Sequence, residues 1–191
     1  MPPPARDAGS DRRSQSKARP ADRPLDRPHV AVVGSGRATA TERLLAEQVG
    51  RALAESGAVV VCGGLGGVME AACRGAKAGG GLTVGILPGS DRADANDHVD
   101  VAVPTGLGEA RNALVVRAAD ALVAVGGEFG TLSEIALALQ AGIPVVGLGT
   151  WELARRGTPD DSVTRLDDPA DAAHLALGLA QARPRHRGAR R

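Results

Sequence analysis

Residues 121–148, ALVAVGGEFGTLSEIALALQAGIPVVGL, decide the fold. The stretch opens with a short apolar run (121–125), passes through a glycine-rich turn into an Ala/Leu-rich segment (131–141), and ends in a β-branched run (143–148). Continuous apolar runs of this length are typical of strands buried on both faces of a parallel sheet. The order strand, helix, strand therefore predicts a right-handed βαβ unit.

The same alternation extends in both directions from this stretch. Apolar runs predict further strands at 29–33, 58–62, 82–87 and 99–103. Ala/Leu-rich segments predict further helices at 41–56, 67–78, 108–119 and 169–181, and a polar loop at 88–98 separates two of the strands. The pattern predicts one α/β domain over 29–182, a doubly wound, mostly parallel, Rossmann-like sheet with helices on both faces.

Charge is distributed unevenly over the 191 residues. Residues 1–28 carry a net +3 and residues 183–191 a net +5, whereas the remainder carries −7. We expect the two basic stretches to be disordered tails, with loose polyanion binding through them as the alternative. Aromatic residues make up 1% of the chain, which argues against base stacking on single-stranded nucleic acid, and no specific nucleic-acid partner is expected.

The cysteines and the N-terminal residues bear on location. Cys62 and Cys73 form no CxxC pair and have no His pair nearby, so core thiols in a reducing cytoplasm are expected rather than a disulfide framework or a metal site. The first residues contain no apolar segment of the kind found in secretory signals, and the apolar stretch 135–151 is broken by Gly142 and Pro144. A cytoplasmic protein with no membrane contact is predicted.

Two Thr-x-x-Glu sequences mark predicted helix starts. Thr39 precedes Glu42 by three residues, and Thr131 precedes Glu134 by the same spacing. Both fit the capping box, in which the two side chains satisfy free backbone N–H groups at a helix N-terminus.

Three strand ends run directly into glycine loops that lead to helices. Glycine lets a backbone approach a phosphate closely, and a helix N-terminus supplies free N–H groups, so these loops predict a phosphate-binding rim at the carboxyl edge of the sheet. No complete G-x-G-x-x-G sequence or P-loop lysine accompanies them, which favours a mononucleotide or related phosphorylated ligand over a dinucleotide or ATP. The candidate ligand-binding residues are Gly34, Ser35, Gly36, Gly63, Gly64, Gly66, Gly67, Asn112, Gly126, Gly127, Gly130 and Thr131.

Arg111 and Glu134 are the candidate catalytic residues. Arg111 lies at the start of a predicted helix, where a cation opposes the helix dipole; it is either a phosphate ligand or a solvated side chain. Glu134 is either the capping partner of Thr131 or a carboxylate that faces the sugar of the ligand.

Three segments carry a resemblance to a known family: 63–89 (GGLGGVMEAACRGAKAGGGLTVGILPG), 105–112 (TGLGEARN) and 126–146 (GGEFGTLSEIALALQAGIPVV). They resemble the LOG-like Rossmann proteins, some of which carry a lysine decarboxylase label, and more closely the branch that includes the molybdenum-cofactor carrier proteins. The enzymes of this superfamily hydrolyse the N-glycosidic bond of cytokinin nucleoside 5′-monophosphates. Their sequence signature is Pro-Gly-Gly-x-Gly-Thr-x-x-Glu with an upstream Arg-Lys.

The resemblance implies that Gly126, Gly127, Gly130, Thr131 and Glu134 fill the signature and that Arg111 fills the arginine. Val125 replaces the proline, Asn112 replaces the lysine, and Glu128-Phe129 replaces a single residue. The carrier-like branch shares these last two departures.

Two functions follow as expectations. The chain either binds and hydrolyses a nucleoside 5′-monophosphate or carries a phosphorylated pterin, the molybdenum cofactor, without catalysis. No required cofactor is expected, and the bound ligand is expected to be either a nucleotide or the molybdenum cofactor. A lysine decarboxylase is excluded because no lysine is suitably placed for a pyridoxal Schiff base. The resemblance also implies a homo-oligomer, a dimer or larger.

Overall fold

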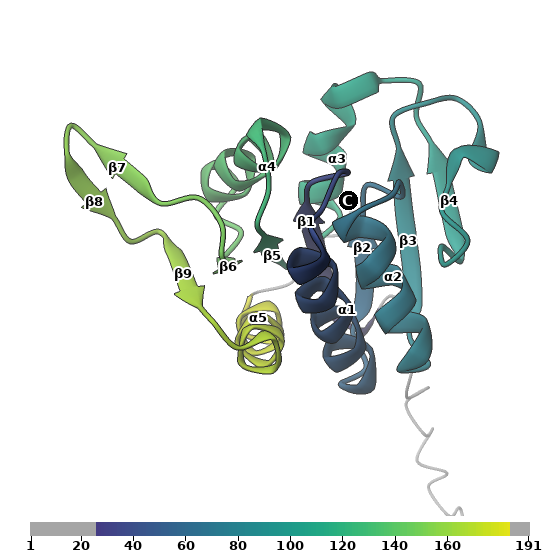
Figure 1. Cartoon of the computed structure of the whole chain (residues 1–191), viewed down its shortest axis with the longest axis horizontal. Coiled ribbons are helices and arrows are strands. Elements are labelled where there is room, and N and C mark those ends of the chain that lie inside the picture. Colours follow the sequence, from purple (N-terminus) through teal and green to yellow (C-terminus); the bar gives the residue numbers. More distant parts are fainter. Residues whose placement is uncertain (1–25, 184–191) are drawn as a thin grey trace, which may run out of the picture.

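A seven-stranded sheet forms the centre of the molecule (Figure 1). The computed structural model describes residues 26–183. The strand order is β4-β3-β2-β1-β5-β6-β9, and every neighbouring pair is parallel. The strands are β1 (His29–Gly34), β2 (Val59–Cys62), β3 (Leu82–Leu87), β4 (Val101–Pro104), β5 (Ala121–Val125), β6 (Val145–Leu148) and β9 (Val163–Leu166). The predicted doubly wound α/β fold is confirmed.

Helices cover both faces of the sheet. One face packs against α1 (Ala40–Glu55), α2 (Val68–Ala78) and α5 (Pro169–Ala182), and the other against α3 (Asn112–Arg117) and α4 (Phe129–Gln140). Successive residues of a strand serve opposite faces: Val30 and Val32 of β1 lie in the first core, and Ala31 and Val33 in the second. Burial on both faces explains why the strands read as unbroken apolar runs.

Helices α1 and α2 pack closely because each contributes a glycine at the contact. A Cβ atom on Gly50 would lie 2.0 Å from the Ala72 carbonyl oxygen, and one on Gly75 would lie 1.9 Å from that of Glu47. This packing fixes α2, and with it the glycine loop that precedes it.

The structure differs from the sequence prediction at three places. The predicted helix 108–119 divides into a 3₁₀ turn η3 (Gly108–Arg111) and the shorter α3. The loop 88–98 contains a 3₁₀ turn η2 (Arg92–Asp94), and after β6 a hairpin of β7 (Leu153–Arg155) and β8 (Thr158–Asp160) leads to β9. Strand β9 was not predicted because its two exposed residues, Thr164 and Arg165, are polar and interrupt any apolar run.

One of the two predicted capping boxes is confirmed and the other is wrong. The Thr39 hydroxyl accepts a hydrogen bond from the Glu42 N–H at 3.2 Å, and the Thr39 N–H donates to Glu42 Oε2 at 2.7 Å. Helix α4, however, begins at Phe129 with Glu128 as its N-cap, and no side chain caps it. Thr131 is therefore inside the first turn, and Glu134 has no capping role.

The predicted tails lie largely outside the described residues. At their inner ends, the Pro28 carbonyl accepts a hydrogen bond from Val59 N–H at 2.9 Å, and the Arg183 guanidinium donates to the carbonyls of Ala119 and Ala141, each at 3.4 Å. Among the described helices, none has the length and apolar character needed to cross a membrane.

Candidate functional site

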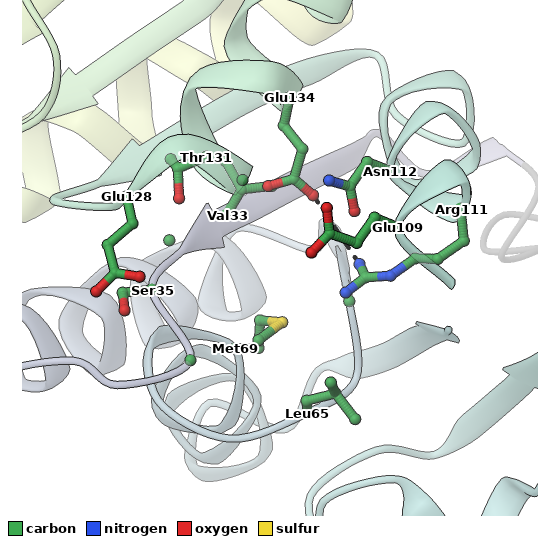
Figure 2. A pocket seen from close by; sticks show the side chains of 14 residues that line it. Val33, Ser35, Leu65, Met69, Glu109, Arg111, Asn112, Glu128, Thr131 and Glu134 are labelled. Carbon is green, nitrogen blue, oxygen red and sulfur yellow. Dashed lines mark ion pairs between the residues drawn. The ribbon is translucent and has the colours of Figure 1, made fainter. Parts of the chain in front are cut away.

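A cavity of about 260 Å³ opens at the carboxyl edge of the sheet, where β1 and β2 end and α4 begins (Figure 2). The chain winds from β1 to β4 on one side of the sheet and then returns to place β5 on the other side of β1. Strand order thus reverses between β1 and β5, which is the position where open α/β sheets bind ligands. The lining residues are Val33, Gly34, Ser35, Gly36, Gly63, Leu65, Met69, Glu109, Arg111, Asn112, Glu128, Gly130, Thr131 and Glu134.

Arg111 is buried in this cavity, so the alternative of a solvated side chain is wrong. The residue is 8% exposed, and its Nε and Nη1 atoms are buried without a hydrogen-bond partner among residues 26–183. Its guanidinium lies against the backbone of Gly63, where a Cβ atom would come within 2.1 Å of Nη1. A buried guanidinium without hydrogen bonds is costly, so this arrangement favours an acceptor group from outside the chain.

Glu134 extends from α4 into the same cavity toward Arg111 (Figure 2). It belongs to the buried face of the helix, which repeats at helical spacing through Thr131, Glu134, Ile135 and Ala138. Its carboxylate is 3.9 Å from Arg111 Nη1, beyond hydrogen-bond distance. Burial raises the pKa of the Glu134 carboxyl to about 7, and the positive charge of Arg111 opposes that rise.

The position of Glu134 depends on where α4 starts. The Glu128 carbonyl accepts hydrogen bonds from the Leu132 N–H at 3.1 Å and from the Trp151 indole at 3.2 Å. The Phe129 ring packs on Trp151, with ring centroids 5.5 Å apart. These contacts hold the first turn of α4 two residues earlier than the sequence predicts.

The structure brings together nine of the fourteen predicted site residues. Beside Arg111 and Glu134, the residues that line the cavity are Gly34, Ser35, Gly36, Gly63, Asn112, Gly130 and Thr131. Five predicted glycines do not line it: Gly64, Gly66, Gly67, Gly126 and Gly127.

Two of these five glycines serve packing between loops. Gly67, with φ of 70°, lies so close to the first glycine loop that a Cβ atom would be 2.2 Å from the Ser35 carbonyl oxygen. Gly64, with φ of 77°, lies against Leu87 of β3. Their glycine character follows from backbone conformation and close approach.

Gly126 and Gly127 line a second hollow, together with Glu42, Gly149, Thr150 and Trp151. The Gly127 N–H donates to Glu42 Oε1 at 3.4 Å, and a Cβ atom on Gly126 would collide with the same carboxylate oxygen. The pKa of Glu42 lies below its ordinary value, chiefly because the carboxylate accepts the Thr39 N–H. The double glycine thus accommodates the capping carboxylate of α1.

Sequence reasoning missed five lining residues: Val33, Leu65, Met69, Glu109 and Glu128. Four of them adjoin a predicted glycine or share a turn with Arg111, and Met69 lies in the first turn of α2, two residues after Gly67. Proximity to the motifs was therefore the available signal. Their side-chain directions depend on the way loops from three strands meet, which the sequence pattern does not encode.

The two cysteines are free and fully buried, as predicted, with their Sγ atoms 3.4 Å apart. The hydrogen bond with the Cys62 thiol, together with burial, raises the pKa of the Cys73 thiol. Residues 26–183 contain no group of three or more His, Cys, Asp or Glu side chains that could hold a metal ion.

The sequence profile of the SLOG cluster4 family matches residues 27–173. The chain belongs to the SLOG cluster4 family. An uncharacterized protein of Archaeoglobus fulgidus is 46% identical to it over 119 residues, which are 62% of this chain and 78% of the relative.

Solved structures similar to this SLOG cluster4 protein include molybdenum-cofactor proteins. The molybdenum cofactor binding protein of Rippkaea orientalis has a TM-score of 0.75 and 37% identity, over 81% of this chain and 98% of the other. The molybdenum cofactor carrier protein of Chlamydomonas reinhardtii has a TM-score of 0.70 and 33% identity, over 82% of this chain and 100% of the other. The expected resemblance to the carrier-like branch is thereby confirmed at the level of structural similarity.

Proposed function

We propose that this protein binds a phosphorylated pterin of the molybdenum-cofactor type and carries it without chemical change. Two similar proteins bind or carry that cofactor, and their chains align with this one over almost their whole length. Of the two functions expected from the sequence, hydrolysis and carriage, this is carriage. The cofactor is then the cargo of the protein and not a catalytic group.

The observation that carries the proposal is the buried guanidinium of Arg111, two nitrogens of which have no hydrogen-bond partner among residues 26–183. Guanidinium groups bind phosphates through charge-assisted hydrogen bonds, and Nε and Nη1 of Arg111 make none with residues 26–183. Ser35, Asn112 and Thr131 add neutral polar side chains to the cavity wall. The residues present therefore fit a phosphate.

The size of the cavity fits one end of such a ligand. Its volume of about 260 Å³ is slightly below the range of roughly 300–1,000 Å³ typical of sites that enclose a whole small molecule. We place the phosphate at Arg111, inside the cavity, and the pterin ring system at the open mouth.

The test is the mass of the small molecules that the protein retains. The protein is purified from cells that synthesise the molybdenum cofactor, and released compounds are analysed by mass spectrometry. Wild type is expected to release the pterin phosphate and Arg111→Met to release little. Arg117→Met, at the exposed end of α3, is the control and should behave as wild type. Equal amounts from all three proteins would contradict binding at Arg111.

A second candidate function, hydrolysis of a nucleoside 5′-monophosphate, is favoured by one observation. Glu134 has no capping role and is a buried carboxyl with a pKa of about 7, which suits acid–base chemistry. The test is release of ribose 5-phosphate from adenosine 5′-monophosphate. If hydrolysis occurs, Glu134→Gln should reduce turnover by roughly a hundredfold or more with an intact helix start. No release by wild type would leave the carrier function. The homo-oligomer stays a prediction, tested by light scattering.

A further inference from the structure

The side chains that line the cavity include more negative than positive groups, although the proposed ligand is an anion. Three carboxylates line it, Glu109, Glu128 and Glu134, against one guanidinium, Arg111. Glu109 and Glu128 are exposed, so water screens their charges. Glu134 and Arg111 are 7% and 8% exposed, and they form the buried charge pair of the cavity.

This buried pair is loosely made. The 3.9 Å separation leaves no hydrogen bond between the two groups, and two guanidinium nitrogens have no hydrogen-bond partner in the described part of the chain. A phosphate that bonds to the Arg111 guanidinium at Nη1 would also lie beside the Glu134 carboxylate. The ligand and Glu134 would then share one positive charge.

Among the described residues that line the cavity, Arg111 is the only cation, and Arg37 lies outside the lining, 4.0 Å from the Glu128 carboxylate. Arg111 and Glu109 come from η3, Glu128 from the N-cap of α4, and the Cys62 thiol from the end of β2. The remaining polar side chains of the wall, Ser35, Asn112 and Thr131, are neutral. A buried carboxylate that no longer has a positive charge to itself is more stable in its protonated, neutral form than as an anion.

We propose that Glu134 takes up one proton when an oxyanion binds Arg111, and that the neutral carboxyl then donates a hydrogen bond to the bound anion. This inference rests on the proposed phosphate site. It makes Glu134 a second hydrogen-bond donor of that site, besides Arg111, and one whose protonation depends on whether the anion is bound. The proton comes from solvent on binding and returns to solvent on release. Glu134 thereby determines specificity, because it favours ligands with an acceptor oxygen within reach of both groups.

The resting protein is already close to this exchange. Burial raises the pKa of the Glu134 carboxyl to about 7, so near neutral pH about half of the molecules carry the proton before any ligand arrives. If the protonated form is the one that binds, the dissociation constant should increase about tenfold between pH 6 and pH 8.

Sulfate is the probe, because it is an oxyanion that does not titrate in this pH range. Calorimetry of the full-length protein at constant ionic strength gives the affinity, and buffers of different ionisation enthalpy give the number of protons taken up. At pH 8 wild type should take up close to one proton per sulfate. Glu134→Gln, whose amide is a neutral donor, should take up almost none and should lose the tenfold pH dependence. Glu134→Ala, which lacks the donor, should also be independent of pH but should bind more weakly than Glu134→Gln.

Glu109→Gln, an exposed carboxylate of the same cavity, is the matched control and should retain the pH dependence. Binding that requires Arg111 but is equally pH-dependent in wild type and Glu134→Gln would overturn the role of Glu134 and leave the phosphate site intact. Absence of Arg111-dependent sulfate binding at either pH would overturn the site itself, and this inference with it.

Discussion

Replacement of Gly63 by alanine should displace the Arg111 guanidinium from its position in the cavity while the side chain keeps its positive charge. The added methyl carbon would lie 2.1 Å from Nη1, 2.5 Å from Nη2 and 2.6 Å from Cζ, so the guanidinium must move. Gly63 does not have a positive φ, and alanine therefore fits its backbone. The displaced group is the end of a flexible side chain, so we expect a stability loss of about 1 kcal/mol, or roughly 2–4 °C in melting temperature.

Binding should suffer much more than stability. A hydrogen bond to a charged group contributes about 1.5–3 kcal/mol, so loss of one such interaction weakens oxyanion binding by about 10- to 150-fold. Calorimetric titration with sulfate at pH 6 measures this directly. Gly130→Ala is the matched control, because Gly130 lines the same cavity and its added methyl carbon would meet nothing within 4 Å. A Gly63→Ala protein that binds sulfate as tightly as wild type would refute the assignment of Arg111 as the anion-binding group.

Three further predictions concern stability and reactivity. Because the pKa of Glu134 is about 7 in the folded protein and 4.5 ordinarily, its contribution to stability is full below about pH 4.5 and is lost as pH rises to 7. Between pH 4.5 and 8, the free energy of unfolding of wild type, measured in urea, should therefore fall by about 3 kcal/mol relative to that of Glu134→Gln. A constant difference between the two proteins would contradict the raised pKa. Thr39→Ala should lower stability by about 1 kcal/mol in the same assay, because it removes the hydroxyl that accepts the Glu42 N–H, and no loss would contradict the capping role. Cys62 and Cys73, which have no exposed surface, should react with a thiol reagent no faster than the protein unfolds, and rapid labelling of the native protein would contradict their burial.

The sequence by itself determined six of the seven strands of the sheet, most of the helices and the edge of the sheet that carries the site. Strands such as β1 and β5 are buried on both faces, so their apolar runs are a local signal that needs no knowledge of distant residues. The glycine loops directly follow the strand ends in the sequence, so they too are a local signal. They predicted that the site lies at the carboxyl edge of the sheet. Arg111 was identified because a cation at a helix start is unfavourable without a partner.

Tertiary structure decided what the two Thr-x-x-Glu sequences do. At Thr39 the helix begins where the sequence predicts, and Glu42 completes the capping box. At Thr131 the same spacing occurs inside a helix, because contacts of Glu128 and Phe129 with Trp151, more than twenty residues away, start α4 earlier. Glu134 is thereby free to enter the cavity.

The glycines show the same division. Gly63 lies against Arg111 and Gly126 against Glu42, although both follow the end of a buried strand in a double-glycine turn. The sequence could place both turns at one edge of the sheet, since parallel strands end together. Which turn faces the cavity depends on the return of the chain from β4 to β5, beside β1, and on the side chains that this crossover brings against each loop.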